Sequence, residues 1–139
     1  MNFGICIWFL PENNHEWYNY TDNFLPHISI KTKLNLKEGV RTFNSINIDT
    51  LNIKIDGELV YDIQENFHSL YFPVKIMDNQ IPNWWPNNAH VSVRYRYDKP
   101  FTKSEIEEVK KMVLVKRAKL NNLKLVDCRE HYKTWYFIK

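Results

Sequence analysis

Two segments with the same alternating pattern constrain this 139-residue chain more than any other feature. The first runs His-Ile-Ser-Ile-Lys-Thr-Lys over residues 27–33, and the second runs His-Val-Ser-Val-Arg-Tyr-Arg over residues 90–96. Both read His-x-Ser-x-cation-x-cation, with a branched aliphatic residue on either side of the serine. Because side chains alternate between the two faces of a β-strand, each segment predicts a half-buried strand that presents imidazole, hydroxyl and cation on one face.

Other patterns add strands and one helix. Apolar or alternating runs predict strands over residues 3–10, 51–55, 67–77, 123–128 and 134–138. Asp56-Gly57 indicates a tight hairpin between residues 53–55 and 59–61. The capping box at residues 102–105 is followed by apolar residues at helical spacing, so a helix is expected from Thr102 to about Leu120. Few helices among many strands are typical of an α+β fold.

The composition predicts one globular domain over residues 1–139. Apolar residues make up 44% of the chain and charged residues 25%, which excludes an intrinsically disordered protein. The net charge of +3 is too small for a protein that coats duplex DNA, but it fits a local site for a small anionic ligand. No apolar run approaches the roughly 20 residues that a membrane span needs, and the N-terminus does not resemble a secretory signal. We therefore expect a cytoplasmic protein with no membrane partner.

The two cysteines, Cys6 and Cys128, lie near opposite ends of the chain. Their number and spacing fit neither a disulfide framework nor a zinc motif. We expect them to be reduced thiols in the core.

A matched pair of imidazoles suits acid–base chemistry. Imidazole titrates near neutral pH, so His27 and His90 can serve as base and acid in one reaction. Ser29 and Ser92 follow two residues later and can hydrogen-bond a non-bridging phosphate oxygen, while the next cation neutralises charge. Two facing strips of this kind would hold a phosphodiester from both sides without a metal ion.

These paired motifs resemble those of the 2H phosphoesterase superfamily, as do Pro26, the N-terminal strand and the capped helix after the second motif. That superfamily includes LigT-like 2′,5′ RNA ligases, cyclic phosphodiesterases and viral enzymes that destroy nucleotide immune messengers. The resemblance implies a bilobal, pseudo-twofold α+β fold, with antiparallel sheets flanking a central cleft and no cofactor. It implies that His27 and His90 are the catalytic acid and base and that Ser29 and Ser92 bind phosphate. This chain departs from the usual pattern in having serine where threonine is more common, which keeps the hydroxyl, and in the short spacing between its motifs. The short spacing resembles that of compact viral members such as the phage anti-CBASS phosphodiesterases.

Further candidate substrate contacts are Trp84, Trp85, Lys31, Arg94, Trp8 and Tyr71. The first two tryptophans lie in a proline-bounded loop before the second motif, where an indole can stack on a nucleobase. The two cations follow the motif serines on the predicted site face, and the last two aromatics lie on predicted central strands that would floor the cleft. For each residue the alternative is an ordinary structural role, as core packing or as a solvated cation.

The sequence thus predicts a monomeric, metal-independent phosphodiesterase that hydrolyses small or cyclic 2′,5′- or 3′,5′-linked oligonucleotides. A viral enzyme of this kind would degrade nucleotide messengers in the host cytoplasm. One alternative is an RNA-end 2′,3′-cyclic phosphodiesterase or a 2′,5′ RNA ligase-like enzyme. Another is a non-catalytic nucleotide-binding sponge, and a third is a site in which His27 and His90 bind a metal ion together with a carboxylate.

Overall fold

The computed structural model describes residues 2–12, 14–18, 21, 24–47, 50–64, 67–112 and 116–139. Its strands are β1 (Ile5–Pro11), β2 (Ile28–Leu34), β3 (Leu51–Ile55), β4 (Val60–Gln64), β5 (Phe67–Ile76), β6 (His90–Arg96), β7 (Arg117–Asp127) and β8 (Tyr136–Phe137). Its helices are α1 (Asn14–Trp17), α2 (Leu36–Ser45), α3 (Lys103–Lys110) and the 3₁₀ turn η1 (Tyr132–Thr134). The predicted α+β class is confirmed. None of the described helices is both long and apolar enough to cross a membrane.

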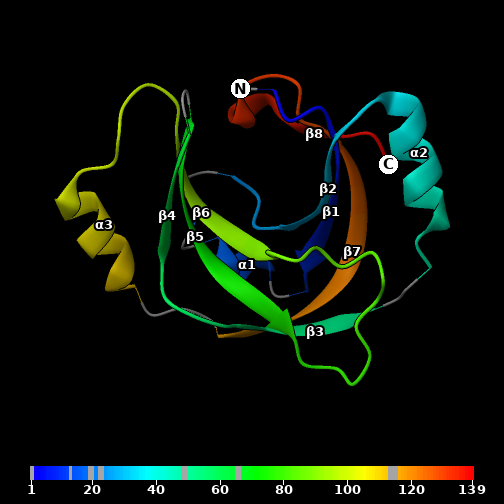
Figure 1. Cartoon of the computed structure of the whole chain (residues 1–139), viewed down its shortest axis with the longest axis horizontal. Coiled ribbons are helices and arrows are strands. Elements are labelled where there is room, and N and C mark those ends of the chain that lie inside the picture. The colour runs from blue at the N-terminus through cyan, green and yellow to red at the C-terminus, as the bar shows by residue number, and fades with distance from the viewer. Residues whose placement is uncertain are drawn as a thin grey trace.

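The described strands form one antiparallel sheet, and six of them close into a ring. The order is β1-β2-β6-β5-β3-β7, and β7 pairs back onto β1. Figure 1 looks down this ring, with β1, β2, β7 and α2 on one side and with β4, β5, β6 and α3 on the other. Two sheets were expected, but β3 pairs with both β5 and β7, and Ile28 pairs with Val91, so that the two sides are continuous.

Helix α2 covers the outer face of β1 and β7, and the sequence analysis placed no element there. It begins at a capping box in which the Asn35 side chain accepts a hydrogen bond from the Glu38 N–H at 2.8 Å. The helix approaches the sheet at Gly39, where a Cβ would lie 2.7 Å from a methyl group of Ile5 and 3.2 Å from one of Leu125. The Asn-x-x-Glu pattern of this capping box is a sequence signal for a helix start, and it could have predicted α2.

Two predicted elements differ from the structure. The helix begins after the Thr102 cap as expected, but α3 ends at Lys110, residues 113–115 lie outside the described part, and residues 117–120 belong to β7. Pairing with β3 buries Ala118 and Leu120, and this tertiary contact overrides the helical spacing. The Asp56-Gly57 hairpin is wrong as well, because both edges of β3 are occupied and β4 pairs with β5 instead.

Candidate active site

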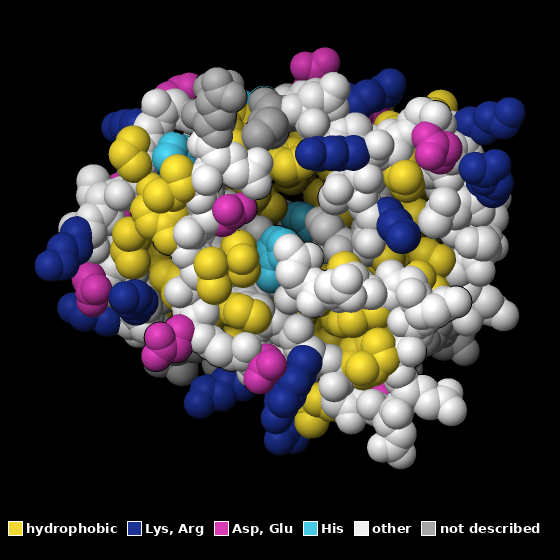
Figure 2. All heavy atoms as spheres, in the orientation of Figure 1, with side chains coloured by type: hydrophobic (Ala, Val, Ile, Leu, Met, Phe, Trp, Pro, Cys, Tyr) yellow, Lys and Arg dark blue, Asp and Glu magenta, His cyan; other side chains and the backbone are white. Residues whose placement is uncertain are grey.

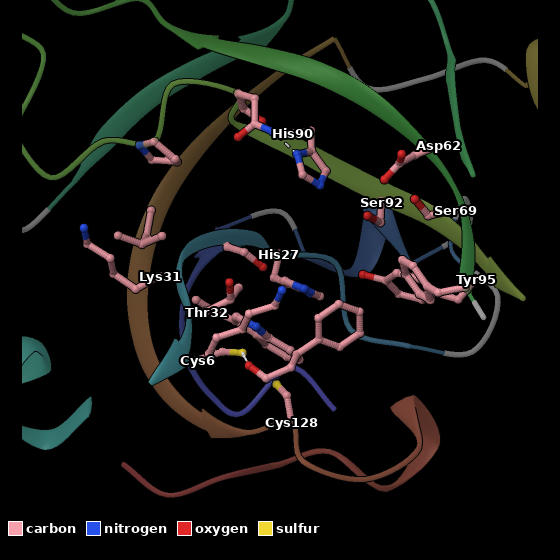
Figure 3. Close-up of a pocket in the computed structure, with 18 of the residues that line it drawn as sticks. Cys6, His27, Lys31, Thr32, Asp62, Ser69, His90, Ser92, Tyr95 and Cys128 are labelled. Carbon is pink, nitrogen blue, oxygen red and sulfur yellow. Dashed lines mark hydrogen bonds between the residues drawn. The ribbon is translucent and has the colours of Figure 1, made fainter. Parts of the chain in front are cut away.

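Both His-x-Ser motifs face one cavity of about 330 Å³. His27, Ser29, His90 and Ser92 all line it, and their strands β2 and β6 are neighbours in the sheet. Figure 2 shows a hollow in this face of the molecule with histidine side chains inside it. In Figure 3 the two imidazoles approach the cavity from opposite walls, His90 from β6 and His27 from the residue before β2. The structure thus brings together the four residues that the sequence singled out.

The two imidazoles are held by the same kind of hydrogen bond. His27 Nδ1 lies 2.7 Å from the carbonyl oxygen of Leu25, and His90 Nδ1 lies 2.8 Å from that of Asn88. A carbonyl oxygen only accepts, so Nδ1 carries the hydrogen in both rings. In the neutral form of each ring, Nε2 therefore holds the lone pair that can accept a proton.

An aromatic ring backs each imidazole. Trp8 stacks on His27, with ring centroids 3.6 Å apart and an interplanar angle of 10°. Tyr71 packs against His90 with centroids 4.2 Å apart. Trp8 and Tyr71 also lie at the same 63-residue offset (8 to 71) as the histidines (27 to 90), on the strands that neighbour each motif. Trp8 lines the cavity as expected, whereas Tyr71 does not and instead supports the His90 ring.

A β-bulge follows the serine in each motif. The extra residue is Ile30 in β2 and Val93 in β6, as the shifts in strand register show. A bulge breaks the alternation of side chains. In β6 it turns Tyr95 toward the cavity and Arg94 away from it.

The prediction that Arg94 contacts the substrate from the motif face is therefore wrong in this structure. Its guanidinium donates to the carbonyl oxygen of Val93 at 2.8 Å, and its side chain borders a hollow beside α3 with Glu105 and Glu108. Lys31, by contrast, borders the cavity as an exposed side chain. In Figure 3 it extends to one side of the two histidines.

The expected stacking surface of Trp84 and Trp85 is also absent from this cavity. Both indoles are half-buried and pack against the core, where Trp84 lies 6.3 Å from the ring of Phe9. Their loop has no helix or strand, as predicted, but it contributes Pro86 and Asn88 to the cavity wall instead. Apolar burial of the indoles explains the difference.

Burial sets the protonation state of His27. His27 is only 4% exposed, and desolvation, opposed by its hydrogen bond to Leu25 and assisted by the nearby His90, lowers its pKa to about 4. His90 is less buried than His27. His27 is therefore neutral at physiological pH, with Nε2 available as a proton acceptor.

Several cavity residues were missed by the sequence analysis: Thr32, Asp62, Gln64, Ser69, Tyr95 and Trp135. Figure 3 places Asp62 and Ser69 beside Ser92, on the wall opposite Cys6 and Cys128. Ser69 lies at the 63-residue offset from Cys6 (6 to 69), so extending the repeat backward from the motifs would have found it. The other missed residues could not be assigned to the cavity without knowing the positions of the bulges and the closure of the six strands into a ring.

Tyr95 and Cys128 remain protonated in this setting. Desolvation raises the pKa of Tyr95, opposed by a hydrogen bond with Ser92, so its hydroxyl stays a donor. A hydrogen bond with Cys6, followed by burial, raises the pKa of Cys128. The cysteines are buried and free, and a thiol held in this form is a poor nucleophile.

Comparisons with protein-family models, curated proteins and solved structures found no match. Within the described ranges, no three His, Cys, Asp or Glu side chains cluster in a way that could hold a metal ion.

Proposed function

We propose that this protein is a phosphodiesterase that cleaves small or cyclic oligonucleotides by acid–base catalysis between His27 and His90, as the resemblance to 2H phosphoesterases implies. The observation that carries the proposal is the pair of imidazoles in one cavity, each fixed through Nδ1 to a backbone carbonyl. A binding site needs cations and aromatic rings, whereas two oriented Nε2 atoms suit proton transfer in both directions.

In the proposed mechanism His27 is the base, which its burial in the neutral form supports, and His90 is the acid. Nε2 of neutral His27 takes a proton from the attacking hydroxyl, which belongs to a ribose or to water, while the hydroxyl oxygen bonds to phosphorus. The bond from phosphorus to the leaving oxygen breaks, and that oxygen takes the proton from Nε2 of protonated His90. Proton exchange with solvent then restores both rings.

Hydroxyl groups and cations in the cavity suit the phosphate. Ser29 and Ser92 border it beside the histidines, and the protonated Tyr95 hydroxyl adds a donor next to Ser92. Lys31 supplies positive charge at the exposed side of the cavity. Asp62 is half-buried and receives a hydrogen bond from Gln64 at 3.2 Å. A carboxylate there accepts from a sugar hydroxyl or a base N–H and disfavours a second phosphate.

The test is hydrolysis of a panel of nucleotides by purified protein in the presence of chelator. The panel holds cyclic di- and trinucleotides, 2′,5′-oligoadenylates, 3′,5′-dinucleotides and 2′,3′-cyclic mononucleotides. The variants are His27→Ala and His90→Ala, and the matched control is His68→Asn, a half-buried histidine that lines none of the described cavities.

We expect each active-site variant to lose about 10²- to 10⁴-fold in kcat while the control keeps wild-type turnover. Cleavage restricted to 2′,3′-cyclic mononucleotides would favour the RNA-end enzyme. Tight nucleotide binding without turnover would favour the non-catalytic nucleotide-binding sponge over the enzyme. Activity lost with chelator and restored by a divalent metal would favour the metal-ligand alternative.

A further inference from the structure

A second, aromatic groove adjoins the catalytic cavity. It measures about 240 Å³, and seven of its nine lining residues are aromatic. Trp8 and Trp135 border both the groove and the cavity. We use the name aromatic groove for the surface formed by Trp8, Tyr18, Tyr132, Trp135, Tyr136 and Phe137.

The groove and the cavity lie on the same face of the sheet. Val126 of β7 pairs with Cys6 of β1 on one side and with Phe137 of β8 on the other. Directly paired residues of antiparallel strands project to the same face. Cys6 lines the cavity and Phe137 lines the groove, so the Trp8 indole stands between two parts of one surface.

Only a short span separates this groove from the catalytic imidazole. The Trp8 ring lies 3.6 Å from His27 on one side and 6.4 Å from Phe137 on the other. Trp135 is half-buried and lies 6.5 Å from His27. In a dinucleotide whose phosphodiester lies beside His27, the nucleoside on one side of the phosphate would reach the groove by passing along Trp135.

We propose that the aromatic groove binds a nucleobase of the substrate, next to the phosphodiester held between the histidines. The inference rests on the proposed function and deepens it, because it makes the preferred substrate at least a dinucleotide. In a 2′,3′-cyclic mononucleotide the phosphate is fused to the ribose of the only base, so that base cannot extend away from the histidines into the groove as the second nucleoside of a dinucleotide can.

Exposure and composition support a nucleobase as the occupant. Tyr18, Tyr136 and Phe137 are 45%, 58% and 42% exposed, although aromatic side chains of this size are usually buried. Stacking on aromatic faces is the common way to bind bases without strict sequence preference. Lys133 lines the groove as well, with its ammonium 5.8 Å from the centre of the Tyr132 ring, and can pair with the phosphate that such a base carries.

The test compares two variants on two substrates. Phe137→Ala removes an exposed ring from the groove, and Ile81→Ala is the matched control, since Ile81 is 67% exposed and lines none of the described cavities. The substrates are an adenosine dinucleotide, in its 3′,5′- and 2′,5′-linked forms, and adenosine 2′,3′-cyclic phosphate. A phosphorothioate-linked adenosine dinucleotide serves as the binding probe in calorimetry, independently of turnover.

We expect Phe137→Ala to lower kcat/KM for the dinucleotide about tenfold through KM, with the cyclic mononucleotide and the control unchanged. An equal loss of kcat/KM on both substrates, or no loss on either, would contradict the groove as a nucleobase site without contradicting the proposed phosphodiesterase function. If the wild type cleaves nothing, the proposed function fails, and binding of the phosphorothioate then tests the groove by itself. Weaker binding by Phe137→Ala would support the groove as a nucleobase site, and unchanged binding would contradict it. Self-association of the wild type in sedimentation that Phe137→Ala abolishes, with nucleotide binding unchanged, would assign the groove to a second copy of the chain.

Discussion

The buried imidazole of His27 makes the stability of the fold depend on pH in a way that one substitution removes. In the unfolded chain this group binds a proton below about pH 6.5, whereas in the folded protein burial lowers its pKa to about 4. Between these values the unfolded state holds more protons, so the free energy of unfolding rises with pH across this window and levels off above pH 6.5. At 1.36 kcal/mol per pH unit, the contribution of His27 amounts to roughly 3 kcal/mol.

The perturbation that isolates this contribution is His27→Asn. The asparagine amide nitrogen stands where Nδ1 stands in histidine, so it can keep the hydrogen bond to Leu25 while the titrating group is gone. Carboxylates also titrate in acid: Arg129 holds the pKa of Asp127 well below its usual range, and Arg96 lowers the pKa of Glu105 to about 2. Those groups are common to both proteins and drop out of the difference.

Urea unfolding followed by far-ultraviolet circular dichroism at pH 7, 6, 5 and 4 measures the effect. Between pH 7 and pH 4 the wild type should lose about 3 kcal/mol more than His27→Asn. His131→Asn is the control, because His131 is exposed and asparagine can still cap η1, and it should parallel the wild type. If His27→Asn also parallels the wild type, the imidazole is not buried as described, and its assignment as a neutral base loses its physical ground.

Three further predictions concern the site and the fold. Trp8→Leu removes the ring that stacks on His27, so the imidazole should titrate at higher pH in an NMR experiment, and the acid limb of kcat/KM should move up with it. If the proposed function holds, Ser29→Ala and Ser92→Ala should each lower kcat/KM by roughly tenfold, because each would remove one proposed hydrogen bond to a charged phosphate. Wild-type kinetics in both variants would contradict that role. Gly39→Ala should destabilise the fold by about 1–2 kcal/mol in chemical denaturation, because its Cβ meets Ile5 at 2.7 Å and the clash exceeds the gain in helix propensity.

The sequence predicted the strands and the motif pair well where local patterning decided the outcome. Alternation located β2, β3 and β6 to within a residue or two, and a capping box located the start of α3. The predictions failed where contacts with a segment distant in the sequence determined the local structure. Residues 117–120 carry a helical pattern but complete a strand beside β3, and the apolar indole of Trp84 finds a core partner in Phe9.

The bulges explain why the alternation of side chains along a strand could not predict every residue of the site. Alternation alone predicted Arg94 in the site and Tyr95 behind it, and the extra residue at Val93 exchanged them. Nothing in the local pattern His-x-Ser-x marks the next residue as a bulge, because Ile30 and Val93 are ordinary strand residues. Only the register against the neighbouring strand shows it.

The 63-residue offset extends further than the two motifs, and the two halves differ in the aromatic residue that backs each imidazole. Trp8 matches Tyr71, Cys6 matches Ser69 and the bulges match, so both halves hold an imidazole in the same way. The first half stacks His27 on an indole and buries it, whereas the second leaves His90 on a phenol ring and more open to solvent. Because desolvation by burial lowers the pKa of His27, exchanging the two aromatic residues in a Trp8→Tyr/Tyr71→Trp variant, which puts a smaller ring against His27, should move the His27 pKa upward, as NMR titration would measure.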